Sequence, residues 1–293
     1  MMTSPLQSVH TGLLEIHYAD TGPRDGEPVI LLHGWPDGIA TWSATAAALN
    51  AAGFRTIAPY LRGFGPNRFL HDDTPRSAQI TALAQDVLDL ADLLGLPRFA
   101  MVGHDWGART GYVLAAQAAH RLTRYVSLSI GYGSSSLSFR QAQQFWYQWF
   151  FAHPQGVAAL QQDRRALCRS LWQSWSPGWR LSDAEFDAVA GGFDNPDWLD
   201  ITLHGYRHRW GLADADPRYA NLETRQQQMP AIAVPTLLIH GADDGCITLD
   251  SSAGSHAWFT GEYQRIVLPG VGHFPQREAA AQTAELIVEW LRA

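Results

Sequence analysis

The chain alternates short apolar runs with helix-like stretches over most of its length, and this alternation restricts the fold more than any other feature. Apolar runs such as PVILLHG (28–34), FRTIAPY (54–60) and RFAMVGHDWG (98–107) alternate with helical patterns such as WSATAAALNAAG (42–53) and ITALAQDVLDLADLLGL (80–96). Such alternation predicts an α/β fold in which helices flank a mostly parallel central sheet. The pattern resumes after residue 234, with strands at 235–241 and 264–269 and helices near 252–259 and over 278–293.

The pattern is interrupted between about Gly131 and Pro217, where no strand is evident. This stretch holds seven of the twelve tryptophans, namely Trp146, Trp149, Trp172, Trp175, Trp179, Trp198 and Trp210. We predict a core domain of residues 1–130 and 218–293 and a helical cap domain of residues 131–217. The cap is expected to cover the carboxyl edge of the sheet, where open α/β folds bind ligands. Most of these tryptophans should pack the cap, and one or two should line a pocket.

Composition and charge exclude several classes of partner. The chain has 21 Lys and Arg against 28 Asp and Glu, a net charge of −7, which argues against a nucleic-acid or anionic-membrane surface. No apolar run approaches the roughly 20 residues of a membrane helix. Cys168 and Cys246 belong to no metal or redox motif. We therefore expect a cytoplasmic protein that acts on a small molecule without a metal or cofactor. The sequence leaves both a monomer and a homodimer possible.

The stretch GHDWG (103–107) has the frame of a nucleophile elbow, with an aspartate where a serine is usual. In such a turn between strand and helix, flanking glycines relieve crowding and the central side chain enters the cleft. Asp105 would be the nucleophile, and the alternative is an ordinary helix N-cap. The N–H of Trp106 would form half of an oxyanion hole. The other half would come from Trp35 in the turn HGWPDG, aimed by a cis Trp35-Pro36 bond, although the same letters also fit an ordinary turn.

A base and an acid are expected late in the chain, after the last two strands. His273 in PGVGHFP stands between the last strand and the last helix, as the order nucleophile, acid, histidine requires. Asp243 and Asp244 both follow the strand PTLLIHG, and Asp244, three residues past Gly241, is favoured. Such an acid holds the imidazole tautomer and stabilises the imidazolium. His33 and His104 are expected to stabilise turns.

An aspartate nucleophile implies attack on saturated carbon. A serine would form an ether there, which activated water cannot hydrolyse, whereas a carboxylate forms an ester whose carbonyl belongs to the enzyme. Asp105 would displace the leaving group, and His273 would then activate water against the ester. A halide would need N–H donors such as indoles, whereas an epoxide oxygen would need a proton, best supplied by phenols.

The motifs HGWP, GHDWG, IHGADDG and GVGHFP together resemble the epoxide hydrolase and haloalkane dehalogenase branch of the α/β-hydrolase fold. The resemblance is closest to epoxide hydrolases, which commonly carry an aromatic where this chain has Trp35; many haloalkane dehalogenases carry a halide-binding asparagine there. It implies an α/β-hydrolase fold and hydrolysis of a small hydrophobic epoxide by water to a vicinal diol. A haloalkane dehalogenase with the same Asp105, His273 and Asp244 is the alternative.

The resemblance also implies two cap tyrosines that hold the epoxide oxygen. The stretch FWYQWFF (145–151) resembles the first tyrosine region and GYR (205–207) the second, so Tyr147 and Tyr206 are the implied acids, with Tyr219 as a rival to Tyr206. Four tryptophans are expected to contact the substrate: Trp35, Trp106, Trp146 and Trp149.

The sequence departs from the patterns of related enzymes at two positions, Trp106 and Tyr60. Arg109 in GHDWGAR resembles fluoroacetate dehalogenases, but these usually have an arginine where Trp106 stands, which disfavours a haloacid. Tyr60 replaces the usual first aspartate of an Asp-x-Arg-Gly turn, so the local hydrogen bonding should differ. A non-catalytic receptor on a hydrolase scaffold is the third hypothesis, and the intact set of nucleophile, base and acid disfavours it.

Overall fold

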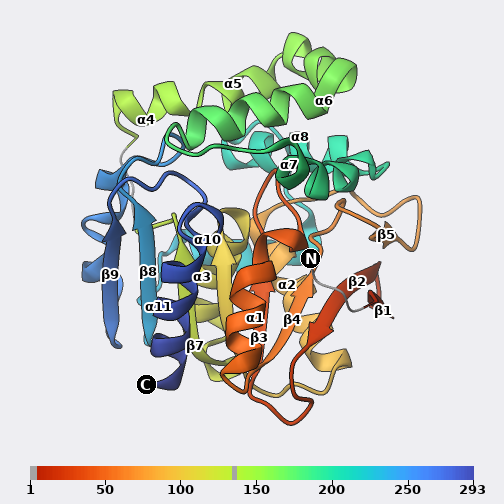
Figure 1. The fold of residues 1–293 in the computed structure, drawn as a ribbon. Coiled ribbons are helices and arrows are strands. Elements are labelled where there is room, and N and C mark those ends of the chain that lie inside the picture. The colour runs from red at the N-terminus through yellow and green to blue at the C-terminus, as the bar shows by residue number, and fades with distance from the viewer. Residues whose placement is uncertain (1–4, 134–136) are drawn as a thin grey trace.

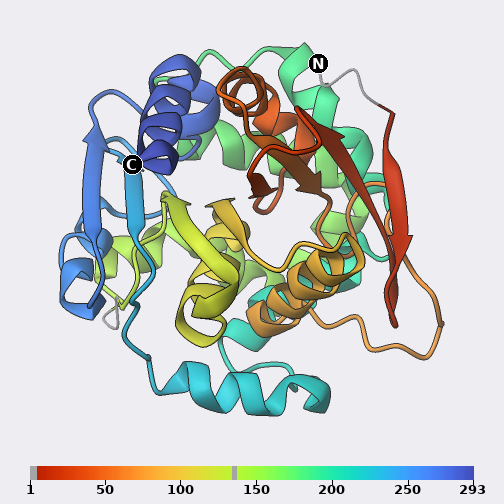
Figure 2. The same cartoon turned by 90° about the horizontal axis from the view of Figure 1, so that it is seen from below.

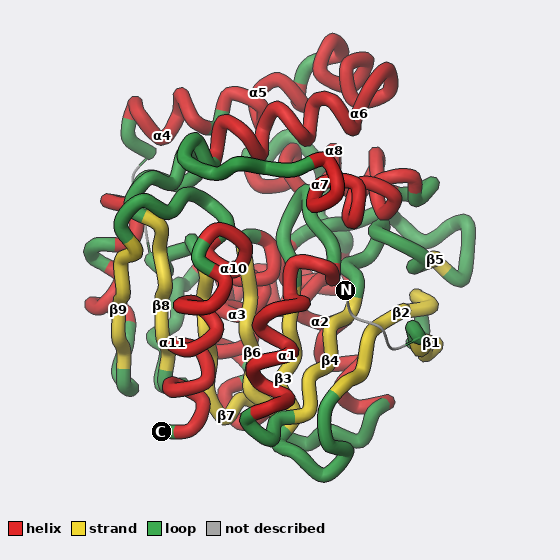
Figure 3. The backbone as a smooth tube through the Cα atoms, in the orientation of Figure 1, coloured by secondary structure: helices red, strands yellow, loops and turns green. Residues whose placement is uncertain are grey.

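A nine-stranded, mostly parallel sheet forms the centre of the protein, whose computed structural model describes residues 5–133 and 137–293 (Figures 1 and 3). The strands are β1 (Gln7–His10), β2 (Leu14–Thr21), β3 (Pro28–Leu32), β4 (Arg55–Pro59), β5 (Arg68–Phe69), β6 (Phe99–His104), β7 (Leu122–Leu128), β8 (Thr236–Gly241) and β9 (Tyr263–Leu268). Their order is β1-β2-β4-β3-β6-β7-β8-β9, and β5 pairs with β2. Among the strands of the described residues, the pairings of β2 with β1, β4 and β5 are antiparallel and the others are parallel. The predicted α/β class is confirmed.

Helices cover both faces of the sheet, so the inner strands are buried on both sides. In β3, Val29 and Leu31 join one buried cluster, whereas Ile30 and Leu32 join the other. The first cluster contains side chains of α1 (Ser43–Ala51) and α11 (Ala280–Arg292), and the second contains those of α2 (Ile80–Leu93) and α3 (Trp106–Gln117). Figure 2 shows these helix pairs on opposite sides of the sheet. Burial on both faces explains the continuous apolar runs that predicted the strands.

A layer of helices follows β7 and lies above the sheet in Figure 1. It consists of α4 (Phe139–Gln144), α5 (Trp146–Ala152), α6 (Pro154–Trp175), α7 (Asp183–Ala190) and α8 (Trp198–Arg209). The next helix, α9 (Ala220–Gln227), contacts the core, because Gln117 Nε2 on α3 donates to Leu222 O at 3.0 Å. The predicted cap limits of 131 and 217 enclose α4 to α8 and stay a prediction.

The structure differs from the sequence prediction outside the cap as well, where β5 and α9 were not predicted. The antiparallel strands β1 and β2 at the N-terminus were not predicted. The helix expected near 252–259 is instead two short 3₁₀ turns, Leu249–Ser252 and Ser255–Trp258. The last helices, α10 (Pro275–Glu278) and α11, follow β9. None of the helices within the described residues is both long and apolar enough to cross a membrane.

Candidate active site

Asp105 lies in the sharp turn between β6 and α3, with φ 50° and ψ −111°. A positive φ is costly for a residue with a side chain and is found where the surrounding structure holds it in place. A Cβ on Gly107 would lie 2.0 Å from Leu32 O, and one on Gly103 would lie 2.4 Å from Gly107 O, so only glycine fits either position. Asp105 makes no side-chain hydrogen bond that caps α3. Its carboxylate is therefore turned into the cleft and not onto the helix end.

One oxygen of the Asp105 carboxylate is held by the turn after β3. The N–H of Trp35 donates to Asp105 Oδ1 at 3.0 Å, and the Trp35-Pro36 bond is cis, as the sequence suggested. A Cβ on Gly34 would lie 2.4 Å from Asp105 Cβ, so this close approach requires glycine. Trp106 begins α3, but no hydrogen bond from its N–H to the carboxylate occurs within residues 5–133 and 137–293. The structure thus provides one of the two expected oxyanion donors at Asp105.

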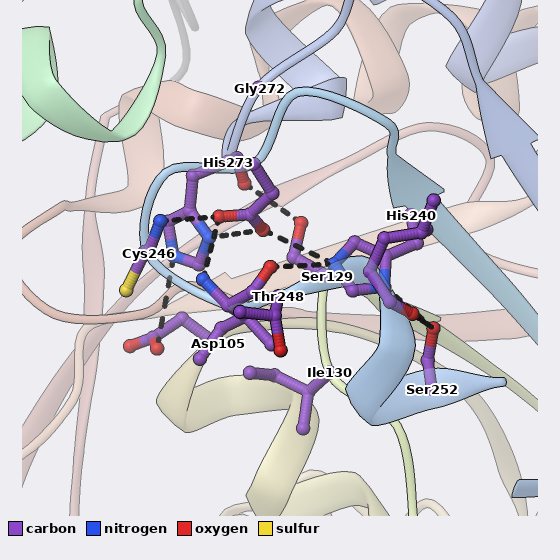
Figure 4. A network of polar contacts seen from close by, with 12 residues as sticks. Asp105, Ser129, Ile130, His240, Cys246, Thr248, Ser252, Gly272 and His273 are labelled. Carbon is purple, nitrogen blue, oxygen red and sulfur yellow. Dashed lines mark hydrogen bonds and ion pairs between the residues drawn. The ribbon is translucent and has the colours of Figure 1, made fainter. Parts of the chain in front are cut away.

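His273 contacts both Asp105 and Asp244, and Figure 4 shows its ring directed toward Asp105. Its Nδ1 donates to Asp244 Oδ2 at 2.9 Å, and its Nε2 lies 3.9 Å from Asp105 Oδ2. That Nε2 is buried and has no hydrogen-bond partner among the described residues. The neutral tautomer with hydrogen on Nδ1 leaves Nε2 as a proton acceptor facing the nucleophile. Asp243, the other candidate acid, is exposed.

The charges of this buried group set its protonation. Burial favours the neutral form of His273 and so lowers its pKa. The negative charge of Asp244, the hydrogen bond between Asp244 and His273, and the charge of Asp105 have a larger opposite effect, so the pKa of His273 is raised. Burial likewise opposes the charge of Asp244, yet His273 and His240 together hold the pKa of Asp244 below its ordinary value. The N–H groups of Cys246 and Ile247 also donate to Asp244 Oδ1, at 2.7 and 2.8 Å. Asp244 is therefore an anion that stabilises the imidazolium form of His273.

A carboxylate that the sequence analysis missed fixes the loop of His273. Glu278 on α10 accepts hydrogen bonds from the N–H groups of Gly272 and Phe274, at 2.8 and 2.9 Å. Glu278 also accepts a hydrogen bond from Ser176 Oγ at 2.6 Å. Ser176 Oγ in turn accepts a hydrogen bond from the N–H of His273 at 3.0 Å. Because both residues flanking His273 are held, its ring has little freedom to turn away from Asp105. The position of Glu278 in the sequence did not indicate that it holds this loop, because the contact forms only where Ser176 at the end of α6 meets Glu278 on α10.

Two more side chains at the site were not identified from the sequence. His240 is fully buried, with Nε2 3.4 Å from Asp244 Oδ2 and Nδ1 2.8 Å from Ser252 Oγ (Figure 4). The sulfur of Cys246 lies 3.7 Å from Tyr147 Oη. Burial raises the pKa of Cys246 well above its ordinary value, so it is a neutral thiol. His240 is the second-last residue of β8, four residues before Asp244, a position that could have suggested a neighbour of Asp244.

Both implied tyrosines lie beside Trp35 and are almost completely buried. Their rings are 5.4 Å apart at right angles, and Trp35 stacks on Tyr147 at 5.7 Å and meets Tyr206 edge-on at 5.0 Å. Trp106 also contacts Tyr206, at 5.4 Å. Burial raises the pKa of both tyrosines well above the ordinary value, so both hydroxyls keep their protons. Tyr219, the rival, is directed elsewhere, because its hydroxyl accepts from Arg62 Nη2 at 3.2 Å.

The structure does not bring Trp146 and Trp149 into the site, which corrects their expected contact with substrate. They are 49% and 38% exposed, and Trp149 packs on Trp210 at 4.2 Å between ring centres. Trp35 and Trp106 are buried at the site as expected. The apolar wall beside Trp35 is formed by Trp175 and Trp198, two of the seven cap tryptophans, together with Phe151.

The two histidines expected to stabilise turns lie at strand ends, His33 directly after β3 and His104 as the last residue of β6. His33 Nδ1 donates to Gly34 O at 2.9 Å, and its Nε2 accepts from the N–H of Leu61 at 3.1 Å. His104 Nε2 donates to the backbone carbonyl of His273 at 2.8 Å. Burial lowers the pKa of His104 to about 4, so it is neutral. In the part of the chain that the structure describes, no group of three or more His, Cys, Asp or Glu could hold a metal ion.

Comparison with known proteins gives one matching family model and several similar proteins. The family model, the alpha/beta hydrolase fold, matches residues 27–280. Epoxide hydrolase A of Mycobacterium tuberculosis is 25% identical and is aligned over 97% of this chain and 96% of its own length. A haloalkane dehalogenase of Psychrobacter cryohalolentis is 37% identical over 45% of this chain and 44% of its own. A crystal structure of a candidate epoxide hydrolase from Klebsiella pneumoniae is 40% identical, with a TM-score of 0.94 over 98% of this chain and 97% of that one.

Proposed function

The chain belongs to the alpha/beta hydrolase fold family, and we propose that it is an epoxide hydrolase that forms a vicinal diol through a covalent ester on Asp105. The epoxide hydrolases among its relatives support the reaction class, hydrolysis of an ether bond. The triad and the cap tyrosines support the mechanism. A cytoplasmic location is part of the proposal, and it is supported by two buried cysteines that form no disulfide.

In the first step, Asp105 Oδ2 attacks a carbon of the epoxide ring. Asp105 Oδ1 is held by the N–H of Trp35, so Oδ2 is the oxygen free to attack. The bond from that carbon to the epoxide oxygen breaks, and its electron pair stays on the oxygen. Tyr147 or Tyr206 donates a proton to this oxygen, which becomes the first hydroxyl of the diol. The product is an ester of Asp105 and a tyrosinate.

In the second step, water hydrolyses the ester at the Asp105 carbonyl carbon. His273 Nε2 takes a proton from the water as it attacks, and Asp244 stabilises the imidazolium that forms. The N–H of Trp35 stabilises the oxyanion. When the intermediate collapses, the second diol oxygen leaves Asp105. At this point one proton is on the imidazolium of His273 and one is on the carboxylic acid of Asp105. These two protons pass to the second diol oxygen and to the tyrosinate, so that the enzyme returns to its starting state and epoxide and water have become a diol.

The tyrosine pair beside the nucleophile is the observation that carries the choice of substrate. An alkoxide leaving group needs a proton, and two buried hydroxyls from α5 and α8 stay protonated because burial raises their pKa. A halide would need indole N–H donors instead. The indole of Trp35 is already engaged, since Nε1 donates to Thr202 Oγ1 at 2.9 Å. The indole N–H of Trp198, which stacks on Trp35, has no partner among the described residues, so the preference for an epoxide over a haloalkane rests on the tyrosine pair.

Hydrolysis of styrene oxide in heavy-oxygen water tests the proposal. In a single turnover with excess enzyme, the heavy atom should enter the Asp105 carboxylate and the diol should carry ordinary oxygen; later turnovers then release the label. Mass spectrometry of the peptide that contains Asp105 measures this. Asp105→Ala should neither turn over nor label elsewhere. Repeated turnover that leaves Asp105 unlabelled would exclude the ester, and a complete lack of turnover on an epoxide panel would favour a receptor.

A further inference from the structure

A second histidine, His240, lies against the proposed catalytic acid. It is fully buried in β8, and its Nε2 lies 3.4 Å from Asp244 Oδ2. The same oxygen accepts a hydrogen bond from His273 Nδ1 at 2.9 Å. Two imidazole rings therefore share one carboxylate oxygen. The two steps of the proposed reaction use His273 and give His240 no part.

The contacts of His240 fix which of its nitrogens carries the hydrogen. Besides Asp244 Oδ2, Nε2 faces the carbonyl oxygen of Ile247 at 3.3 Å. Both oxygens can only accept a hydrogen bond, because Asp244 is an anion. Nε2 therefore carries a hydrogen, which is directed toward these two oxygens. A neutral ring then has no hydrogen left for Nδ1, so Nδ1 must accept a hydrogen bond.

Ser252 and Arg265 supply the hydrogen bond that Nδ1 needs. The buried Ser252 Oγ lies 2.8 Å from His240 Nδ1 (Figure 4), and it accepts from Arg265 Nε at 2.9 Å. Leu249 O, 3.0 Å from Ser252 Oγ, is the other possible acceptor for the hydroxyl, but it already accepts from Arg265 Nη2 at 3.0 Å. The hydroxyl hydrogen is therefore free for His240. A chain of donors runs from Arg265 through Ser252 and His240 to Asp244.

The N–H of His240 affects how tightly His273 holds a proton. His273 must be neutral to take a proton from water, whereas negative charge around it favours the imidazolium. The negative groups that act on it are the carboxylates of Asp244, Asp105 and Glu278. His104, whose ring packs on His273 at 4.9 Å, is neutral. A donor beside Asp244 Oδ2 draws part of the carboxylate charge toward itself and so weakens the hold of Asp244 on the imidazolium.

We propose that His240 is a positioning residue for ester hydrolysis, which draws charge from Asp244 so that His273 can give up its proton and act as the base. This inference rests on the proposed function, because it concerns the second step of that reaction. Ser252 and Arg265 hold the ring of His240 in the tautomer that donates to Asp244. Formation of the ester on Asp105 needs no base, so its rate should not depend on His240.

Two variants separate the hydrogen bond of His240 from the volume of its ring. His240→Gln places an amide N–H close to the position of Nε2–H, whereas His240→Met is similar in size and has no donor. In His240→Met the charge of Asp244 acts undivided on His273. The acidic limb of ester hydrolysis should then move to higher pH by about one pH unit, and the rate well below the limb should fall about tenfold. His240→Gln should recover most of the wild-type limb.

Single-turnover kinetics on styrene oxide across a pH series measure these effects. The decay of the ester reports on His273, and the formation of the ester should keep the wild-type rate in both variants. The control for loss of a histidine is His256→Met, because His256 is exposed, and its acidic limb should coincide with that of the wild type.

Nitrogen NMR of the histidine rings tests the inference in the free enzyme, without turnover. The signals of His240 and His273 are assigned by their loss in His240→Gln and His273→Gln. In the wild type, His240 should carry hydrogen on Nε2 and none on Nδ1. In His240→Met, the titration of His273 should move to higher pH, as the kinetic limb does.

The outcomes separate this inference from the function on which it rests. An acidic limb in His240→Met at or below the wild-type pH overturns it, because Asp244 would then have lost its orientation and not gained charge. A shift in His240→Gln as large as in His240→Met also overturns it, as does hydrogen on Nδ1 of His240. A wild type that never forms the ester on Asp105 overturns the proposed function instead, and the NMR titration then decides on His240 by itself. Ester formation at the wild-type rate shows that the variants fold.

Discussion

At the scale of single residues, the tyrosine pair separates the epoxide reaction from dehalogenation. We expect Tyr147→Phe and Tyr206→Phe each to lower kcat/KM for styrene oxide by about tenfold or more, and the double variant by about 10²–10⁴-fold, the range of general acid catalysis. Neither change removes the nucleophile, so slow ester formation should remain. The control is Tyr219→Phe, whose hydroxyl accepts from Arg62 and not from the site, and whose kinetics should match the wild type. Release of bromide from a bromoalkane by the double variant, with no loss of rate, would favour a dehalogenase.

The pKa of His273 gives a second prediction at this scale. Neutral His273 is needed to activate water, and its pKa is raised, so hydrolysis of the ester should slow as the pH falls through that raised value. In Asp244→Asn the main charge opposing burial is lost, so the pKa of His273 falls and the acidic limb moves to lower pH. The maximum rate should also drop by about 10²–10⁴-fold, because the imidazole loses its orientation.

Single-turnover decay of the ester across a pH series measures both effects. Asp243→Asn is the matched control, since Asp243 is the neighbouring aspartate, is exposed and makes no bond to His273. Its acidic limb should coincide with that of the wild type. An acidic limb in Asp244→Asn at the wild-type pH would mean that Asp244 does not set the protonation of His273.

At the scale of elements, the strands that the sequence predicted are those buried on both faces. β3, β6 and β8 are continuous apolar runs because each strand is covered on both sides by other elements. β2 reads LEIHYADT, with a polar residue at nearly every second position, and the side chains of Glu15, His17 and Thr21 are only half-buried. A pattern of this kind is weaker than a continuous run, and β1 and β2 were accordingly missed.

The site residues likewise divide into those that the sequence could predict and those that it could not. Asp105, Asp244 and His273 each follow a strand, so chain order alone could suggest them. Glu278 fixes the loop of His273 together with Ser176, which is 102 residues away in sequence, and only the packed fold brings these two together. His240 lies four residues before Asp244, but its contact with that carboxylate depends on the turn after β8. Trp146 and Trp149 were wrongly expected at the substrate because they flank Tyr147 in sequence.

The helix geometry of α5 explains that error. Residues four apart lie on one face of a helix, so Tyr147 and Phe151 face inward together, and both are buried. Trp146 and Trp149, three apart, share the opposite face and are exposed. A helical wheel over 146–152 could have separated the two faces from the sequence alone.

At the scale of the whole molecule, one fully buried arginine joins the core to the segment that follows the cap. Arg62 donates to Asp86 on α2 through Nε and Nη2, at 2.7 and 2.6 Å, to Ser77 O at 2.9 Å and to the hydroxyl of Tyr219. Arg62 lies two residues after Tyr60, which occupies the position where an aspartate is usual in this turn. The carboxylate that pairs with Arg62 is instead that of Asp86 on α2. Arg62 is fully buried, Asp86 is largely buried, and neither hydrogen-bonds to Asp105 among the described residues, so the pair should affect stability and not the chemical step.

We expect Arg62→Met to lower the free energy of unfolding by about 3–5 kcal/mol, because it leaves the Asp86 carboxylate without its buried partner. Adding Asp86→Leu removes that charge as well and should restore a substantial part of the loss. Urea unfolding followed by circular dichroism measures the three proteins. Arg165→Met, which breaks the exposed pair with Asp194, is the control and should cost less than about 1 kcal/mol. If Arg62→Met costs no more than Arg165→Met, or if the double variant is less stable than the single one, then Arg62 does not join these parts of the molecule through its charge.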